Sequence, residues 1–345
     1  MKNNLISSNP DALKKEAFNN KSWQVTERQI CDLELLLNGA FAPLTGFMDE
    51  ADYQSVLKNL RLKDGSLWPM PITLDVDEDF VKELSNGDKI TLRDHEGFAL
   101  AVLTISDIYQ PDFKAEAQAV YGTIDETHPA VNYLYNHSKP VYLGGSLEGI
   151  ALPHHYDYKE NRHTPEELKS IFKEKGWKKI VAFQTRNPLH RAHVEMTMRA
   201  SQELDANLLI HPVVGMTKPG DVDHYTRVRC YQHVLPKYPE NSAMMSLLPL
   251  AMRMGGPREA LWHALIRKNF GCTHIVVGRD HAGPGYDKDG NPFYGPYDAQ
   301  ELLLKYQDEI GIEMVPFKFM VYLPEEDRYE AIDAVEKGTD FKTIS

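Results

Sequence analysis

Two short polar runs, each placed directly after an apolar segment, carry residue types that bind anions. The first, QTRNPLHRAH, follows the apolar residues 180–183. Its potential cations and hydrogen-bonding side chains are Gln184, Thr185, Arg186, Asn187, His190, Arg191 and His193. The second run, GRDHAGPG at residues 278–285, follows the apolar HIVV and combines Arg279 and His281 with three glycines. Arginine grips oxyanions with a planar fork, and glycine lets a backbone approach a ligand closely, so the two runs predict a site for a phosphate-bearing ligand.

The elements that must position these runs are predicted from the pattern after residue 160, where apolar strands alternate with helices. Thr164, Pro165 and Glu167 fit the N-cap, first and third positions of a helix that Gly176 ends. Strands are predicted at 179–183, 208–214, 243–248, 273–277 and 312–317, with helices at 191–204, 226–235, 257–271 and 299–309. Five short strands separated by helices are typical of a doubly wound parallel sheet.

In such sheets ligands bind beyond the carboxyl ends of the strands, near the point where the strand order reverses. Both polar runs begin at a predicted strand end, so we expect them to line one anion site. The helix that begins near residues 189–193 would also direct its free N–H groups and its positive dipole end toward that site.

Residues 1–160 have a different pattern. Short β-type segments alternate with turn signals such as KDGS, SNGD and DHEG, which is typical of a small antiparallel barrel or sandwich. Residues 89–105 predict a hairpin that turns at residues 95–97.

Composition limits the classes of protein. A chain of 345 residues with 42% hydrophobic and 26% charged residues predicts two or more domains. The net charge of −12 argues against a general nucleic-acid binder. Cys31, Cys230 and Cys272 lie far apart and form no C-x-x-C pair, so neither a disulfide framework nor a thiolate metal site is indicated, and a reducing cytoplasm fits. The N-terminus has no apolar signal region and the chain no window of about 18 apolar residues, so neither secretion nor a membrane partner is predicted.

Each candidate residue also has a structural interpretation. Arg186 and Arg279 could pair with Asp280 or Glu195, and Asn187 before Pro188 is a common turn residue. The two histidines of H-x-x-H lack the i, i+4 spacing and the intervening glutamate of a zinc protease helix. Neither a Walker A motif nor G-x-G-x-x-G occurs, which disfavours a P-loop kinase and an ordinary Rossmann dehydrogenase.

The two runs resemble the signatures of the ATP sulfurylase (sulfate adenylyltransferase) family. QTRNPLHRAH fits Q-x-R-N-P-x-H-x-x-H, GRDHAGPG fits the family's second loop, and HPVVGMTKPGDVDHYTR, LLPLAMRMGGPREALWHALIRKNFG and LLLNGAFAPLTGFM extend the resemblance over nearly the whole chain. It implies a mostly-β PUA-like domain at 1–160 and an HUP-type, Rossmann-like α/β nucleotidyltransferase domain at 161–323. Residues 324–345 would begin a small C-terminal domain that is expected to be incomplete, because family members continue after an ISGT run where this sequence reads KTIS.

The resemblance also implies a reaction, MgATP plus sulfate giving adenosine 5′-phosphosulfate (APS) and pyrophosphate, by direct in-line attack of sulfate on the α-phosphorus. The catalytic residues it implies are Thr185, Arg186, Asn187, His190 and His193. The ATP-binding residues it implies are Gln184, Thr185, Arg186, Asn187, Gly278, Arg279, Asp280, His281 and Met320. Sulfate would be held by Gln184, Arg186 and the backbone N–H of Ala282.

The implied cofactor is Mg²⁺ bound to ATP, with no tightly held protein metal. APS kinase or APS reductase and a pyrophosphatase would remove the products, and a cytoplasmic homo-oligomer with no nucleic-acid partner is expected. Alternatives are the same enzyme run toward ATP in a sulfur oxidiser, another H-x-x-H adenylyltransferase with a phosphoester or carboxylate nucleophile, and an RNA-binding or regulatory protein with a PUA-like domain. Sulfate-dependent release of pyrophosphate would separate the last two from the main interpretation.

Overall fold

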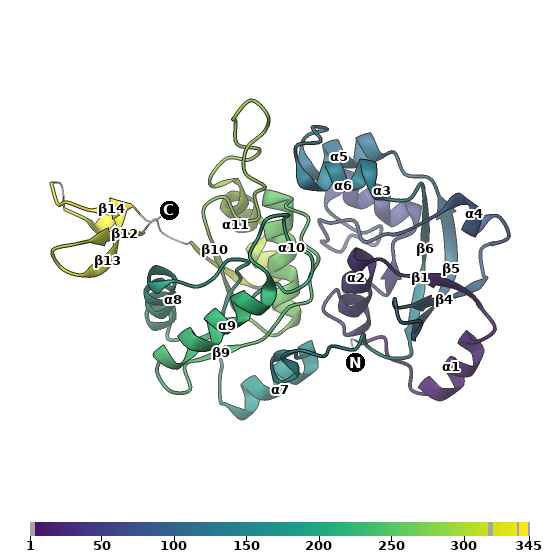
Figure 1. Cartoon of the computed structure of the whole chain (residues 1–345), viewed down its shortest axis with the longest axis horizontal. Coiled ribbons are helices and arrows are strands. Elements are labelled where there is room, and N and C mark those ends of the chain that lie inside the picture. The colour runs from purple at the N-terminus through teal and green to yellow at the C-terminus, as the bar shows by residue number, and fades with distance from the viewer. Residues whose placement is uncertain (1–3, 317–319, 337, 344–345) are drawn as a thin grey trace.

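The computed structural model describes residues 4–316, 320–336 and 338–343, which form three β-sheets in chain order (Figure 1). The first sheet belongs to the N-terminal part, the second to the part that carries both polar runs, and the third to the C-terminal segment. The described residues contain no helix that is both long and apolar enough to cross a lipid bilayer.

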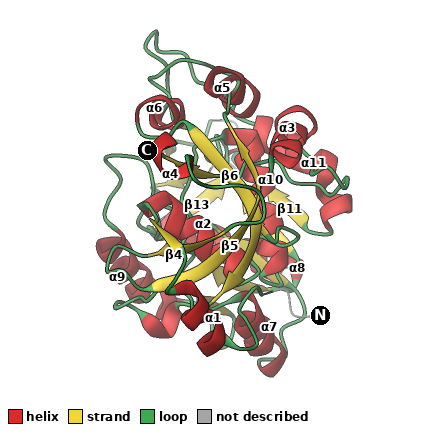
Figure 2. Cartoon of the chain, turned by 90° about the vertical axis from the view of Figure 1, so that its right-hand side faces the viewer, coloured by secondary structure: helices red, strands yellow, loops and turns green. Residues whose placement is uncertain are grey.

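The N-terminal part is built on one mixed sheet whose strand order is β1-β4-β5-β6-β2, with β3 paired to β6. Its strands are β1 (Lys21–Gln24), β2 (Gly46–Phe47), β3 (Leu74–Val76), β4 (Lys89–Arg93), β5 (Ala99–Tyr109) and β6 (Val141–Gly149). The predicted hairpin is confirmed, because β4 and β5 pair antiparallel on either side of residues 94–98. Figure 2 shows β5 and β6 as long, curved strands. Among the described strands of this sheet, β1 and β4 pair in parallel and the other pairs are antiparallel.

Helices accompany this sheet to an extent that the β-type pattern did not predict. They are α1 (Pro10–Ala17), α2 (Glu27–Leu37), α3 (Glu50–Asn59), α4 (Glu78–Val81), α5 (Phe113–Tyr121) and α6 (Pro129–Asn136). Their starts were visible in the sequence as capping residues, for example Thr26, whose side chain and backbone form a reciprocal capping box with Gln29. The region therefore has a central sheet with helices packed around it.

The second sheet contains five parallel strands in the order β11-β10-β7-β8-β9. The strands are β7 (Ile180–Phe183), β8 (Asn207–Ile210), β9 (Ala243–Met245), β10 (His274–Val277) and β11 (Glu313–Pro316). The helices are α7 (Pro165–Glu174), α8 (Arg191–Leu204), α9 (His224–Val234), α10 (Gly256–Asn269) and α11 (Asp298–Ile310), with short 3₁₀ turns at Lys159–Asn161 and Leu235–Lys237. Every predicted strand and helix of this part is present, but β8 and β9 end earlier than the predicted 208–214 and 243–248. The strand order reverses between β7 and β10.

Alternating side chains of the central strands separate into two hydrophobic clusters, one on each face of this sheet. Ile180 and Ala182 of β7 belong to a large cluster that includes α10 and α11, whereas Val181 and Phe183 pack with α8 and α9. This is the period of two expected for a strand buried on both faces. The large cluster continues into the N-terminal part, where Phe41 lies against Trp262 of α10 with ring centroids 5.2 Å apart.

The C-terminal segment forms a small sheet in the order β13-β12-β14. Its strands are β12 (Met320–Leu323), β13 (Arg328–Ala331) and β14 (Lys342–Thr343), with a 3₁₀ turn at Ile332–Ala334. Ion pairs join it to α8, because Arg191 contacts Asp327 at 3.0 Å and Arg199 contacts Glu330 at 2.6 Å. β12 ends at the predicted domain boundary, residue 323, and pairs with β13 and β14 beyond it. The domain limits themselves stay predictions.

Candidate functional site at the strand ends

Both polar runs leave the same edge of the parallel sheet from neighbouring strands. Gln184 follows β7 and Gly278 follows β10, and these two strands pair in parallel with Val181 opposite His274. The first loop (residues 184–190) and the second loop (residues 278–285) therefore begin side by side at the point where the strand order reverses. This is where open α/β sheets bind ligands.

The first loop is held by hydrogen bonds among Thr185, Asn187 and helix α9. The buried Thr185 hydroxyl donates to the carbonyl of Asn187 at 3.1 Å and accepts from its N–H at 3.0 Å. The hydroxyl of the buried Tyr231 donates to the same carbonyl at 2.7 Å. The Thr185 side chain thus shapes the loop, while the exposed Asn187 side chain stays available to a ligand.

Arg186 forms an ion pair with Asp221. The partners considered from the sequence were instead Asp280 and Glu195. Asp221 also accepts the backbone N–H of Lys218 at 3.2 Å. The Lys218 ammonium in turn donates to the carbonyl of Pro284 in the second loop at 2.6 Å. Residues 218–221 therefore connect the two loops, and an oxyanion bound to Arg186 would compete with Asp221.

The second loop contains two non-glycine residues in the left-handed region, Asp280 with φ 52° and Ala282 with φ 56°. Such a conformation costs an alanine on the order of 1 to 3 kcal/mol and persists only where the surroundings enforce it. Here the N–H of Asp280 donates to Pro296 at 2.9 Å, and the carbonyl of Ala282 accepts from Gly256 at 3.1 Å. Strain of this kind is common at ligand sites.

Three cations act on the Asp280 carboxyl. Partial burial raises the pKa of Asp280, and the charges of Arg186, Arg279 and Lys218 oppose that rise. The same carboxyl therefore senses cations from the first loop, from the second loop and from the segment between them. Arg186 and Arg279 therefore act on the same carboxyl, although 93 positions separate them in the chain.

The H-x-x-H histidines lie at the start of α8, where His190 is the N-cap residue. The rings of His190 and His193 have centroids 3.9 Å apart. Burial lowers the pKa of both residues, that of His193 to about 4, and the neighbouring His190 adds to the effect on His193. Both rings are therefore neutral near pH 7 in the ligand-free protein, and Arg191 is engaged with Glu195 at 2.9 Å. The first polar run therefore carries fewer positive charges than its four potential cations, Arg186, His190, Arg191 and His193, predicted.

Two residues of α10, Glu259 and His263, support the loops, although the sequence analysis assigned them no role. Gln184 Nε2 lies 3.5 Å from Nε2 of the fully buried His263 in α10, and His263 Nδ1 lies 3.0 Å from Nε2 of His281. His263 Nε2 is also 3.3 Å from the buried carboxylate of Glu259. The signal for these residues was a histidine and a glutamate one helical turn apart in the otherwise apolar face of REALWHALI.

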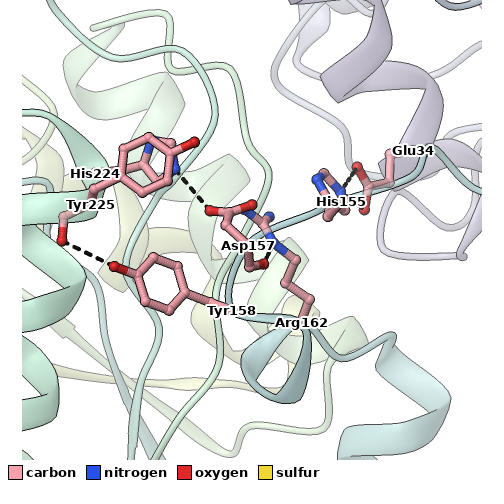
Figure 3. A network of polar contacts seen from close by, with 7 residues as sticks. All are labelled: Glu34, His155, Asp157, Tyr158, Arg162, His224 and Tyr225. Atoms are coloured by element: carbon pink, nitrogen blue, oxygen red, sulfur yellow. Dashed lines mark hydrogen bonds and ion pairs between the residues drawn. The ribbon is translucent and has the colours of Figure 1, made fainter.

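The segment that joins the two parts of the chain is anchored on both sides (Figure 3). His155 contacts Glu34 of α2 at 2.9 Å, and Asp157 contacts both Arg162 at 2.9 Å and His224 at 3.0 Å. Because His224 is the first residue of α9, this network fixes the end of the segment that carries Lys218 and Asp221. Tyr158 adds a hydrogen bond to the carbonyl of Tyr225 at 3.3 Å.

Two remaining expectations concern Met320 and metals. The backbone of Met320 begins β12, and its side chain lies outside the described residues, so its predicted contact with adenine stays a prediction. Among the described residues there is no group of three or more His, Cys, Asp or Glu side chains arranged to hold a metal ion. Cys31, Cys230 and Cys272 are free thiols.

A parallel sheet of this strand order, with ligand-type loops at its switch point, defines the Rossmann-like class of α/β domains. Comparison with family models is more specific. Residues 159–345, more than half of the chain, match the ATP-sulfurylase family, and residues 1–152 match a PUA-like domain. The chain belongs to the ATP-sulfurylase family.

Curated relatives agree with this assignment. The chain is 55% identical over 350 residues to a sulfate adenylyltransferase of Mycosarcoma maydis, covering 100% of this chain and 61% of the relative. It is 54% identical to a sulfate adenylyltransferase of Saccharomyces cerevisiae, covering 94% of this chain and 65% of the relative. A solved structure described as a hexameric APS kinase from Thiobacillus denitrificans is similar with a TM-score of 0.80 and 31% identity, covering 99% of this chain and 60% of that one. The chain spans about three fifths of the length of these proteins.

Proposed function

We propose that this chain is a sulfate adenylyltransferase, which converts MgATP and sulfate to APS and pyrophosphate by in-line attack of a sulfate oxygen on the α-phosphorus of ATP. The observation that carries the proposal is that the two loops leave neighbouring strands at the switch point and are connected through Arg186, Asp221 and Lys218. Membership of the ATP-sulfurylase family and the names of the relatives support it.

The chemistry accounts for the residue types. Sulfate is fully ionised at neutral pH, so it needs no general base to become a nucleophile. The barrier is instead electrostatic, because a dianion must approach the phosphorus of a polyanion. Catalysis then consists of positioning and of neutralising charge, as in other phosphoryl transfers. Fixed cations and oriented N–H groups are the appropriate tools.

Sulfate is proposed to bind between Gln184, Arg186 and the backbone N–H of Ala282. The guanidinium of Arg186 can hold two oxygens of a tetrahedral anion at once, and the amide of Gln184 offers two further donors. The ion pair between Arg186 and Asp221 keeps the guanidinium in place before sulfate arrives. Sulfate binding then shifts Arg186 from the carboxylate to the substrate, or shares it between the two.

ATP is proposed to lie across both loops. The second loop contributes Gly278, Arg279, Asp280 and His281, the first contributes Thr185, Arg186 and Asn187 beside the α-phosphate, and Met320 lies near adenine. His190 and His193 are proposed to donate hydrogen bonds to the transition state and to departing pyrophosphate, since a neutral imidazole still carries one N–H. The N-terminus of α8 directs further N–H groups to the same region.

Mg²⁺ enters this proposal as the counter-ion of ATP. The anhydride between phosphate and sulfate is a high-energy bond, so net APS formation requires enzymes that consume its products, such as APS kinase or APS reductase and a pyrophosphatase. A cytoplasmic location and a homo-oligomer complete the proposal. The reverse reaction, ATP from APS and pyrophosphate, uses the same site.

The test is release of pyrophosphate from MgATP by the purified chain, with sulfate varied and with no acceptor, a phosphoester or a carboxylate in parallel. We expect release that depends on sulfate and APS as the second product. Release that depends on a phosphoester or carboxylate instead would identify another adenylyltransferase. Retained ATP binding without release under any of these conditions would contradict the proposed activity.

A further inference from the structure

The contacts of His263 determine which of its ring nitrogens carries the hydrogen. Burial opposes ionisation of Glu259, but His263 and the backbone N–H groups of Arg253 and Gly255 outweigh it and lower the pKa of Glu259. Glu259 is therefore a carboxylate, which can only accept. Because His263 Nε2 lies 3.3 Å from that carboxylate, the hydrogen of His263 belongs on Nε2.

The position of the ring hydrogen on His281 follows from its position on His263. Burial, with Glu259 opposing it, lowers the pKa of His263, so this ring is neutral and its Nδ1 carries a lone pair. His281 Nε2 lies 3.0 Å from this Nδ1 and must supply the hydrogen of the bond. Burial also lowers the pKa of His281 well below its usual value, and the charge of Arg267 acts in the same direction. Nδ1 of His281 is then the nitrogen left for a ligand, and it is an acceptor.

The side-chain amide of Gln184 is oriented by Nε2 of His263. With Gln184 Nε2 turned toward His263 Nε2, two donors face each other at 3.5 Å, and the buried Oε1 of Gln184 has no hydrogen-bond partner among the described residues. Half a turn of the amide resolves both conflicts. Oε1 then shares the Nε2–H of His263 with the Glu259 carboxylate, and the NH₂ group occupies the buried position, where it needs a hydrogen-bond acceptor.

We propose that Glu259 and His263 are positioning residues that determine which hydrogen-bond donors and acceptors both loops present to a ligand. They present a lone pair on His281 Nδ1 to a ligand donor, such as a ribose hydroxyl or the adenine amino group, and the NH₂ of Gln184 to a sulfate oxygen. This inference rests on the proposed function for the identity of the ligands. The tautomers themselves belong to the ligand-free protein and do not depend on it.

The first experiment is long-range ¹H–¹⁵N NMR of the ligand-free chain labelled at histidine nitrogen, near pH 7. Signals are assigned by their loss in His263→Gln and His281→Gln. We expect both rings to be neutral with hydrogen on Nε2. A His281 ring that is protonated on Nδ1 overturns the proposal, whether or not the chain turns over sulfate.

The second experiment uses two amides that each replace one nitrogen of His263. Asparagine places its carbonyl near the former Nδ1 and can accept from His281, whereas glutamine places its NH₂ near the former Nε2 and can donate toward Gln184. His263→Gln is expected to raise the KM for ATP about tenfold with little change in the KM for sulfate, and His263→Asn is expected to do the reverse.

The matched control is His274→Gln. His274 is also buried and also faces a glutamate, Glu313, at 3.4 Å, but it lies at the opposite end of β10. It is expected to change neither KM. Equal effects of the two His263 variants on both substrates, or effects no larger than those of His274→Gln, would overturn the positioning role. Circular dichroism verifies that the variants fold, and the NMR result on the unmodified chain decides the tautomers if one variant does not.

Discussion

Arg186 offers the sharpest test of the proposed sulfate site. Its side chain is 22% exposed, pairs with Asp221 and acts on the carboxyl of Asp280. Arg186→Lys keeps the positive charge and can keep the ion pair, but it replaces a planar fork with a single ammonium on a flexible stem. The substitution therefore separates oriented hydrogen bonding from charge alone.

The expected loss can be estimated from the chemistry of oriented donors. Removing one such donor from a preorganised site costs about 2.7 to 4 kcal/mol in the transition state, or roughly 100 to 1,000 in rate. Stability should change little, because a partly exposed ion pair contributes up to about 1 kcal/mol and lysine retains part of it. For a chain of this size the thermal midpoint should move by no more than about 4 °C.

The assay combines steady-state pyrophosphate release at varied sulfate with calorimetric titration of ATP. We expect the sulfate-dependent kcat/KM to fall by the factor above and ATP affinity to change much less. The matched control is Arg191→Lys, in the same polar run, because Arg191 is exposed and engaged with Glu195 and Asp327. Retained turnover in Arg186→Lys would remove this side chain from the sulfate site, and an unfolded variant would assign it a structural role.

Three further predictions concern stability. The buried His128 accepts from the N–H of Ala130 and contacts Tyr294, and burial lowers its pKa to about 4. Between about pH 6.5 and 4 the unfolded chain therefore binds a proton that the native chain does not, so the free energy of unfolding should fall by about 3 kcal/mol over this range, at 1.36 kcal/mol per pH unit. Urea unfolding of His128→Gln should show a shallower pH dependence than that of wild type. Asp32 and Arg253, whose side chains are each 2% exposed, form an ion pair that joins α2 to the second part of the chain. Asp32→Asn should lower the free energy of unfolding in urea by about 3 to 5 kcal/mol, because it leaves a buried charge unpaired, and combining Asp32→Leu with Arg253→Met should lower it less. Equal losses would show that the burial of unpaired charge is not the cause. Gly256 has φ 50°, and a Cβ there would lie 2.4 Å from the Tyr294 ring. A Cβ on Gly255 would meet the flexible end of Met70 at 3.2 Å and would make ordinary contacts with Glu259 and Tyr121 at 3.6 and 3.7 Å. Gly256→Ala should therefore lower the thermal midpoint clearly and Gly255→Ala should leave it within a few degrees, a ranking that similar midpoints would refute.

Much of the fold could be predicted because local signals agree with it. Apolar runs of five to seven residues located every strand of the parallel sheet, although two predicted strands were too long. The run at 208–214 forms regular pairing only over Asn207–Ile210, and beyond it Val213 retains a single bridge to Leu248. Pro212 interrupts the run, since it has no N–H to donate to a neighbouring strand. Apolar content shows burial, but it does not show where hydrogen-bonded pairing stops.

The helices of the N-terminal part were harder to predict. Several of them are short, such as α4 and α6, and their hydrophobic spacing covers only one or two turns. A pattern this short cannot be distinguished from a strand or a loop without the sheet on which it packs. Capping residues such as Asp49 and Asp112, which accept N–H groups at the starts of α3 and α5, were the available signal.

The polar runs identified where the candidate site would be, but the residues that shape it come from segments with no obvious chemistry. Lys218, Asp221, Glu259 and His263 reach the two loops because β7 and β10 are neighbours and because α10 packs beneath them. Strand order is a long-range property that no local pattern encodes. For the same reason, the sequence suggested four cations in the first run, whereas burial makes His190 and His193 neutral in the ligand-free protein.

The neutral histidines and the three fixed cations have complementary consequences for a polyanionic ligand. Arg186, Arg279 and Lys218 supply positive charge that attracts the anion. A bound polyphosphate beside His190 and His193 favours their protonated forms and so opposes the effect of burial on their pKa. The histidines can therefore gain charge when a polyanion binds, whereas burial otherwise keeps these two adjacent rings neutral. The structural cost of this arrangement lies in the strained second loop and in the ion pair of Arg186 with Asp221, which an anion must displace or share.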